Sequence, residues 1–263
     1  MHVVAVQLDT VWEDREASHA RAAALIERAA PPTGALVVLP EMFATGFSMA
    51  VERIAEEPGG PTHRFLADAA CRHRAWMLGG VVARHADGRG LNQALLVSPD
   101  GREAARYTKL HPFSFAGEPR HYAAGEEVVV VGCGEARLAP FVCYDLRFPE
   151  AFRVAARRGA TVLVVIANWP SARVEHWLAL LAGRAIENQA FVIGVNRCGS
   201  DPRVDYPGRS LVVDPHGRVL ADAGSGEGAI AVDLDLAELM TYRKAFPALA
   251  DMRADLVPDL RQG

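Results

Sequence analysis

The chain lacks any long run of apolar residues. Its longest apolar stretches, residues 160–167 and 128–131, are far shorter than the roughly 20 residues that a membrane-spanning helix needs. No basic stripe accompanies the net charge of −4, which argues against binding to nucleic acid. The first residues, Met-His-Val-Val-Ala-Val-Gln-Leu-Asp, lack the basic flank and cleavage site of a signal peptide and are typical of a strand. We therefore expect a cytoplasmic protein with neither a membrane nor a nucleic-acid partner.

Cysteine is scarce, and metal-binding motifs are missing. The four cysteines, Cys71, Cys133, Cys143 and Cys198, show no C-x-x-C spacing, which favours reduced thiols over a disulfide framework. The nine histidines form neither a His-x-His nor a His-Glu-x-x-His motif. Local motifs therefore predict no metal, although ligands can converge from distant positions.

Strand-like and helix-like segments alternate along the chain. Expected strands include residues 3–8, 77–83, 92–97, 128–131, 137–142, 161–167 and 191–196, and expected helices include residues 15–29, 62–76 and 172–189. Such alternation predicts an α/β protein whose sheets are covered by helices. Hairpin turns at Ser-Pro-Asp-Gly and Asp-Pro-His-Gly predict that strand direction is mixed. No linker or low-complexity tract interrupts the pattern, so we expect a single domain over residues 1–263.

Three segments end at a chemically reactive side chain. Cys143 follows the apolar residues 137–142 and precedes Pro149, which suits a first helical position; the order predicts a strand, a sharp turn and a helix, with the thiol at the turn. Glu41 ends another apolar run, and Lys109 follows a strand-like stretch. A single cysteine is more often a packing residue, but a thiol, a carboxylate and an ammonium at such positions are the parts of an amide hydrolase.

Seven short motifs then occur in a familiar order: Leu-Pro-Glu41-Met-Phe, Lys109-Leu-His, Gly117-Glu118, Val-Cys143-Tyr-Asp-Leu-Arg-Phe-Pro, Ala167-Asn-Trp-Pro170, Arg184-Ala-Ile-Glu-Asn-Gln189 and Asn196-Arg197. Together they resemble the nitrilase superfamily of carbon–nitrogen hydrolases, from the first strand to about Val232. The resemblance implies a four-layer α-β-β-α sandwich with two mixed sheets and pseudo-twofold symmetry. Two similar segments, Leu-Val-Val-Leu-Pro-Glu41 and Leu-Val-Val-Ile-Ala-Asn168, fit that symmetry.

The resemblance also implies roles for individual residues. Cys143 would attack the amide carbonyl and form a thioester. Glu41 would take the thiol proton, pass it to the departing ammonia and then activate water. Lys109 would stabilise the oxyanion together with the backbone N–H of Tyr144. We also expect the lysine ammonium to stabilise a thiolate and make the thiol reactive near neutral pH.

Other charged residues near these motifs are compatible with more than one role on sequence grounds. Glu118 either orients the substrate and the lysine, as in the family, or is a loop carboxylate paired with Arg120. Asp145 and Arg147 are expected to pair with one another or with charged residues of the 172–189 helix, and so to fix the turn at the cysteine.

The segment after residue 167 suggests the substrate. Asn168, Trp169 and Arg173 make the chain most similar to the ω-amidase branch, which hydrolyses the terminal amide of 2-oxoglutaramate or 2-oxosuccinamate without a cofactor. Arg173 would bind the distal carboxylate and keto oxygen, with Asn168 and Trp169 as the intervening wall; the alternative is an exposed arginine early in a helix. The resemblance further implies a homodimer, with roughly the last 25 residues crossing between subunits.

Several alternatives remain open at this point. The same three catalytic residues would serve an aliphatic amidase, an N-carbamoyl amine hydrolase or a nitrilase. A binding protein that has lost catalysis, a metal amidohydrolase and a Cys-His protease using His111 or His176 are further possibilities.

Overall fold

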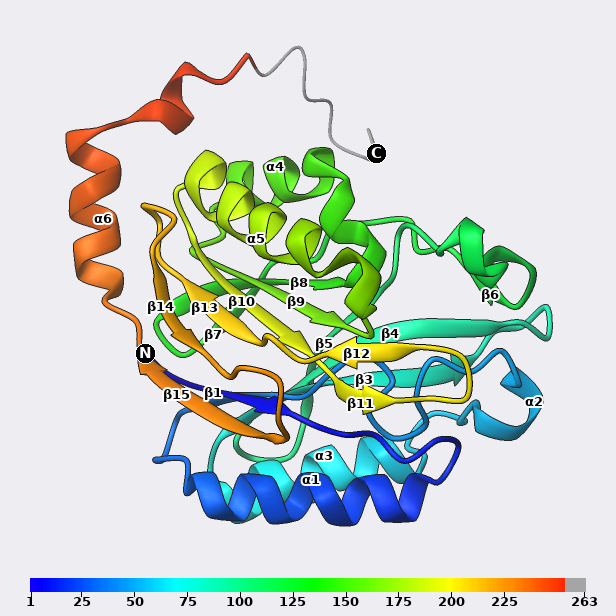
Figure 1. Cartoon of the computed structure of the whole chain (residues 1–263). Coiled ribbons are helices and arrows are strands. Elements are labelled where there is room, and N and C mark those ends of the chain that lie inside the picture. Colours follow the sequence, from blue (N-terminus) through cyan, green and yellow to red (C-terminus); the bar gives the residue numbers. More distant parts are fainter. Residues whose placement is uncertain (254–263) are drawn as a thin grey trace.

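The structure is a computed structural model that describes residues 1–253. Figure 1 shows four layers, with helices on the outer faces of two stacked sheets. The predicted α-β-β-α sandwich is therefore confirmed. Within the described part of the chain, no helix is long and apolar enough to cross a membrane.

The first sheet contains, in spatial order, β15 (Gly228–Asp233), β1 (His2–Gln7), β2 (Leu36–Val38), β3 (Trp76–Arg84), β4 (Gly90–Val97) and β5 (Glu103–Thr108), with β6 (Tyr122–Ala123) paired to β4. The second contains β14 (Val219–Asp222), β13 (Leu211–Val213), β10 (Phe191–Asn196), β9 (Val162–Ala167), β8 (Ala136–Val142) and β7 (Val131–Cys133). A separate hairpin is formed by β11 (Cys198–Ser200) and β12 (Asp205–Pro207).

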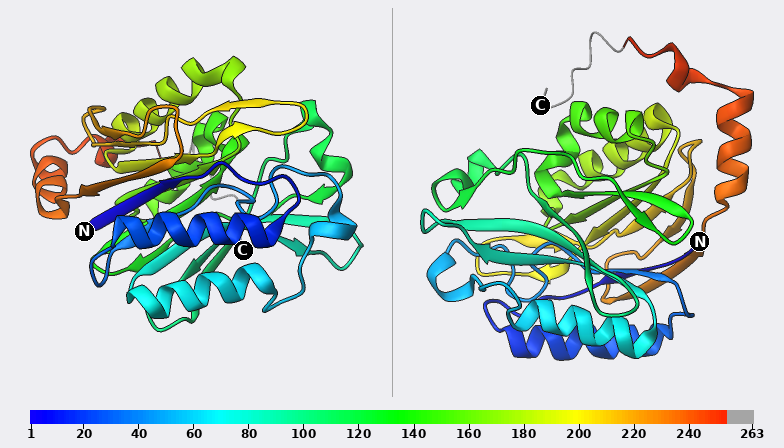
Figure 2. Two further views of the ribbon diagram at one scale, coloured as in Figure 1. Left: turned by 60° about the horizontal axis from the view of Figure 1, so that its bottom comes forward. Right: turned by 180° about the vertical axis from the view of Figure 1, so that it is seen from behind.

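Helices cover the sheets on their outer faces (Figures 1 and 2). The α-helices are α1 (Arg15–Ala29), α2 (Val51–Ile54), α3 (Pro61–His73), α4 (Pro149–Arg157), α5 (Val174–Asn188) and α6 (Leu236–Ala245). Short 3-10 turns are η1 (Ser114–Ala116), η2 (Glu118–Arg120), η3 (Cys143–Arg147), η4 (Ser171–Arg173) and η5 (Ala248–Asp251).

Local sequence signals explain where the helices begin and end. The Asp14 side chain accepts the Ala17 N–H at 3.0 Å and caps α1. The residue after the helix, Ala30, has a left-handed conformation and precedes two prolines. Proline occupies the first position of α3 and of α4, where its missing N–H costs nothing. The expected helix over residues 172–189 begins at Val174, so Arg173 lies in the preceding turn η4.

The two halves of the chain repeat one topology. Strands β1, β2 and β3 are parallel and are followed by antiparallel β4 and β5. Strands β8, β9 and β10 are parallel and are followed by antiparallel β13 and β14. The predicted internal symmetry therefore holds, with β2 equivalent to β9. Because the ends of these two strands carry Glu41 and Asn168, the repeat brings those residues to one region.

One buried cluster contains side chains from both sheets, including Leu36 and Leu78 of the first and Phe141 and Val164 of the second. A single domain over residues 1–263 stays a prediction. The expected crossing tail begins within α6 and continues through η5, and its last part, residues 254–263, lies outside the described residues.

Strand β3 packs directly against the backbone that carries Glu41. The Gly80 N–H donates to the Pro40 carbonyl at 3.1 Å, and a Cβ at Gly80 would lie 2.1 Å from the Met42 nitrogen and 2.7 Å from the Glu41 Cα. We expect Gly80→Ala to lower the free energy of unfolding by about 1–3 kcal/mol, because the added methyl group overpacks backbone that cannot move away. Denaturant unfolding measures this change.

Gly183 on α5 is the matched control. A Cβ there meets nothing within 4 Å, so Gly183→Ala should raise the unfolding free energy by about 0.5–1 kcal/mol through helix propensity. Equal effects of the two substitutions would contradict this account of Gly80.

Candidate active site

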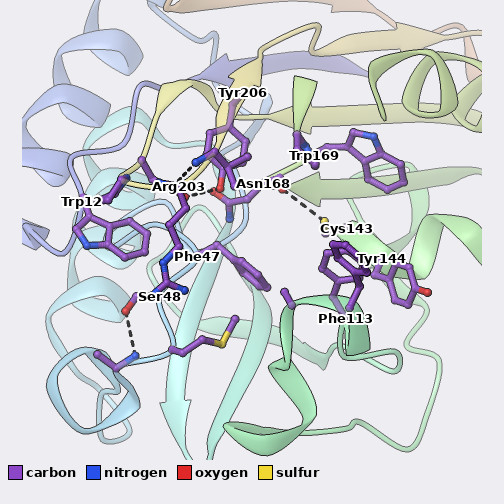
Figure 3. A pocket seen from close by; sticks show the side chains of 18 of the residues that line it. Trp12, Phe47, Ser48, Phe113, Cys143, Tyr144, Asn168, Trp169, Arg203 and Tyr206 are labelled. Atoms are coloured by element: carbon purple, nitrogen blue, oxygen red, sulfur yellow. Dashed lines mark hydrogen bonds between the residues drawn. The ribbon is translucent and has the colours of Figure 1, made fainter. Parts of the chain in front are cut away.

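Cys143 lies at a sharp turn between β8 and α4. It has a φ of 47°, a conformation that is uncommon for a residue with a side chain and that is often found at functional positions. The residue as a whole is 9% exposed and lines a cavity (Figure 3). The predicted order of strand, turn and helix is confirmed.

Asp145 holds this turn in place. Its buried carboxylate accepts the Val142 N–H at 3.0 Å, the Tyr107 hydroxyl at 2.7 Å and the His111 N–H at 2.9 Å. The His111 ring nitrogen Nδ1 also lies 2.8 Å from it. The expectation that Asp145 pairs with Arg147 or with the 172–189 helix is wrong. The carboxylate instead joins the turn to the end of β8 and to the end of β5 and the segment that follows it.

That helix does support the turn through a different residue. Arg184 of α5 donates to the Leu146 carbonyl at 2.8 Å and pairs with Glu187 at 2.8 Å. Arg147 has no carboxylate partner within residues 1–253. Its guanidinium lies 3.1 Å from the His176 ring and stacks over Trp169 at 4.9 Å.

Glu41, Lys109 and Glu118 form a buried charged group. The Lys109 Nζ lies 3.0 Å from the Glu41 Oε1 and 2.9 Å from the Glu118 Oε2, and all three side chains are at most 1% exposed. Asn92 donates to Glu41 at 2.7 Å and to Glu118 at 3.0 Å. Glu118 thus binds Lys109 rather than Arg120.

The electrostatics of the group follow from its composition. Burial disfavours charge on Lys109, but the carboxylates of Glu118 and Glu41 outweigh burial and raise the pKa of Lys109 well above its usual value. The lysine therefore stays an ammonium throughout the physiological pH range.

The thiol responds in the opposite sense to our expectation. Burial, followed by the nearby Glu41 carboxylate, raises the pKa of Cys143 well above its usual value, and the opposing effect of Lys109 is smaller. The expected thiolate is therefore wrong for the resting site. A protonated thiol needs a base at the moment it reacts.

Asn168 connects the carboxylate to the thiol. Its backbone N–H donates to the Glu41 Oε2 at 2.8 Å, and its side-chain amide donates to the Glu41 carbonyl at 2.8 Å. Its own carbonyl lies 3.9 Å from the Cys143 sulfur. The end of β9 and the segment after β2 are thereby held together beside the Cys143 sulfur.

The cavity has a volume of about 660 Å³. Phe47, Phe113, Tyr144 and Tyr206 contribute aromatic walls (Figure 3). Arg173 lines it as well, with its guanidinium 5.5 Å from the Phe113 ring centre.

Asn168 and Trp169 also line this cavity, but the protein itself uses the side-chain amide nitrogen of Asn168 and the indole nitrogen of Trp169. The Trp169 indole N–H donates to the Arg173 carbonyl at 2.7 Å, and the Trp169 side chain is almost fully buried. Trp169 therefore fixes the turn that carries Arg173 and offers the cavity little polar surface.

Sequence reasoning missed Asn92, the contacts of Asp145 and the cationic residue Arg203 at the cavity. For Asn92 a signal existed, because an amide inside the apolar strand 90–97 is unusual. In residues 1–253 no group of three or more histidine, cysteine or acidic side chains is arranged to hold a metal ion.

Known proteins resemble this chain over most of its length. The family model for carbon-nitrogen hydrolases matches residues 2–244. The omega-amidase YafV of Yersinia enterocolitica is 41% identical over 248 residues, 94% of each chain. A 2-oxoglutaramate amidase of Bacillus subtilis is 36% identical over 222 residues, which cover 84% of this chain and 86% of the relative.

A solved structure from Xanthomonas campestris has the same fold. It is described as a CN-hydrolase superfamily protein with an arsenic adduct in its active site. It superposes with a TM-score of 0.91 at 36% identity and covers 96% of this chain and 97% of its own. The predicted resemblance is confirmed: the chain belongs to the carbon–nitrogen hydrolase family.

Proposed function

We propose that this protein is a thiol amidase that converts a small 2-oxo dicarboxylic monoamide, such as 2-oxoglutaramate or 2-oxosuccinamate, to the acid and ammonia. The observation that carries the proposal is the buried group of Glu41, Lys109 and Glu118, which Asn168 joins to Cys143. The names of the relatives support the substrate class.

The first half of the reaction uses the protonated thiol. Glu41 takes the proton as the Cys143 sulfur attacks the amide carbonyl. The resulting oxyanion is stabilised by the Lys109 ammonium and the Tyr144 N–H. Glu41 then gives the proton to the nitrogen, ammonia leaves, and a thioester remains on Cys143.

The second half reverses these roles. Glu41 removes a proton from a water molecule, which attacks the thioester, and the returned proton restores the thiol. Glu118 and Asn92 keep Lys109 and Glu41 in place through the contacts described above. An aliphatic amidase, an N-carbamoyl amine hydrolase or a nitrilase would use the same groups. The residues that bind the acyl end of the substrate must therefore distinguish the proposed activity from these others.

Arg173 is our candidate for that end. Its guanidinium has no carboxylate partner among residues 1–253, and it faces the cavity beside Phe113. A planar guanidinium suits a carboxylate with an adjacent keto oxygen. Arg147 offers a second guanidinium in the same cavity.

We also propose a cytoplasmic homodimer that needs no cofactor. Ile186 on α5 is 52% exposed and Phe246, just after α6, is 58% exposed. Large apolar side chains exposed to water favour association with a partner surface.

Replacing Glu41 with Gln should lower the rate of ammonia release by on the order of 10²-fold or more, because the amide keeps the shape but cannot carry a proton. The exposed residue Glu150 on α4 is the control, and Glu150→Gln should retain the wild-type rate. Steady-state ammonia release from 2-oxoglutaramate measures both.

Mass spectrometry of the wild-type enzyme during turnover should find the acyl group on Cys143. An adduct on Cys71, Cys133 or Cys198 would contradict the mechanism. In the rate measurement described above, a Glu41→Gln enzyme that keeps more than half the wild-type rate would also contradict it. The latter result would favour a histidine base.

Replacing Arg173 with Ala should reduce kcat/KM for 2-oxoglutaramate by roughly 10- to 10²-fold, the loss expected for a charge-assisted contact. A small neutral amide, which has no carboxylate to bind, should be almost unaffected. Measuring Arg147→Ala in parallel identifies which guanidinium binds the carboxylate. Equal losses on both substrates would mean that Arg173 is structural.

A further inference from the structure

Arg147 brings a positive charge to the cavity without an anionic partner. It lies in the turn η3, four residues after Cys143 and half-buried, and it lines the cavity. No carboxylate within residues 1–253 pairs with its guanidinium. The charge is therefore free for an anionic ligand in the cavity.

Two uncharged groups hold this guanidinium instead. The carbon atom of the Arg147 guanidinium lies 4.9 Å from the centre of the Trp169 ring, and its Nη2 atom lies 3.1 Å from the Nδ1 atom of His176. A guanidinium can only donate hydrogen bonds, so Nδ1 must accept, and an imidazole that accepts at Nδ1 is neutral and carries its hydrogen on Nε2. The two contacts thus restrict the direction of Arg147 and leave its charge intact.

The fold fixes the two groups that hold Arg147. Trp169 is 2% exposed, its indole N–H donates to the Arg173 carbonyl at 2.7 Å, and its ring centre lies 5.6 Å from that of Trp177. Trp177 is fully buried and donates to the Arg209 carbonyl at 2.7 Å. His176 directly precedes Trp177 in the first turn of α5, so the backbone that carries the imidazole is anchored.

Trp169 also brings the two arginines of the acyl end together. Arg147 lies over its ring, and the backbone of Arg173 accepts its indole N–H. A 2-oxo acid presents three oxygen atoms, two on the carboxylate and one on the keto group. One planar guanidinium binds two oxygen atoms side by side, so this end of the substrate suits two guanidinium groups better than one.

We infer that His176 is a positioning residue for substrate binding, whose neutral Nδ1 directs the Arg147 guanidinium toward the 2-oxo acid end without neutralising it. This inference rests on the proposed function, in which Arg147 is the second guanidinium available to that end. A carboxylate at position 176 would also orient Arg147, but it would cancel the charge that the substrate needs. The role therefore requires an acceptor that is neutral, which a merely structural contact would not.

Steady-state ammonia release from 2-oxoglutaramate and from pentanamide, a neutral amide of the same chain length, tests this inference. His176→Leu removes the acceptor, so KM for 2-oxoglutaramate should rise roughly three- to tenfold, as expected for one hydrogen bond, while kcat stays unchanged. His176→Gln supplies another neutral acceptor and should keep KM near the wild-type value. His176→Glu should raise KM by about tenfold or more, because its carboxylate pairs with Arg147. The values for pentanamide should not change in any of the three variants.

His85→Leu is the matched control. His85 lies between β3 and β4 with a 39% exposed side chain, and its replacement should change no value for either amide. In an Arg147→Ala enzyme, His176→Leu should cause no further loss, because the two residues act through one contact.

Four results with the position-176 variants would overturn the inference and leave the proposed function intact. They are a wild-type KM for 2-oxoglutaramate in His176→Leu, equal KM values for the Leu and Gln variants, a KM at or below the wild-type value in His176→Glu, and equal losses on both amides. A wild-type KM for 2-oxoglutaramate in Arg147→Ala would do the same. Failure of the wild-type enzyme to hydrolyse 2-oxoglutaramate would refute the proposed function, and this inference with it.

Discussion

The burial of the Lys109 ammonium between Glu41 and Glu118 is the interaction on which the rest of the site depends. Removing charges from water costs several kcal/mol per ion, and the cost is recovered only where the geometry is good and further hydrogen bonds complete the set. Asn92 and the Asn168 N–H supply those bonds to Glu41. Loss of Lys109 would leave two buried carboxylates without a cation, so the lysine holds the three groups together as a unit.

Burial and this charged unit together raise the pKa of the Cys143 thiol. Burial is the largest cause of the raised pKa of Cys143, and the nearby Glu41 carboxylate adds to it against the smaller opposing effect of Lys109. In the proposed mechanism Glu41 therefore accepts the thiol proton as the sulfur attacks the amide carbonyl. The repeated topology of the two halves brings these residues together. The equivalent strands β2 and β9 place Glu41 and Asn168 side by side, and Cys143 follows the end of β8.

The sequence predicted the parts of the fold and site that depend on local signals. The strand, turn and helix around Cys143 follow from an apolar run and Pro149, and the layers follow from alternating elements and a family resemblance. The contacts of Asp145 with Tyr107 and His111 join residues more than thirty positions apart, which no local pattern specifies. The hairpin β11–β12 was missed because its strands of three residues are too short to show alternation.

The protonation state of Cys143 tests the central claim most directly. The ultraviolet difference between wild-type enzyme and Cys143→Ala, recorded against pH, isolates the thiolate of this residue because the other three cysteines cancel. A raised pKa predicts no thiolate signal at neutral pH and its appearance only above about pH 8.5, the ordinary thiol value. A thiolate signal that is present at neutral pH and lost only in acid would contradict the account.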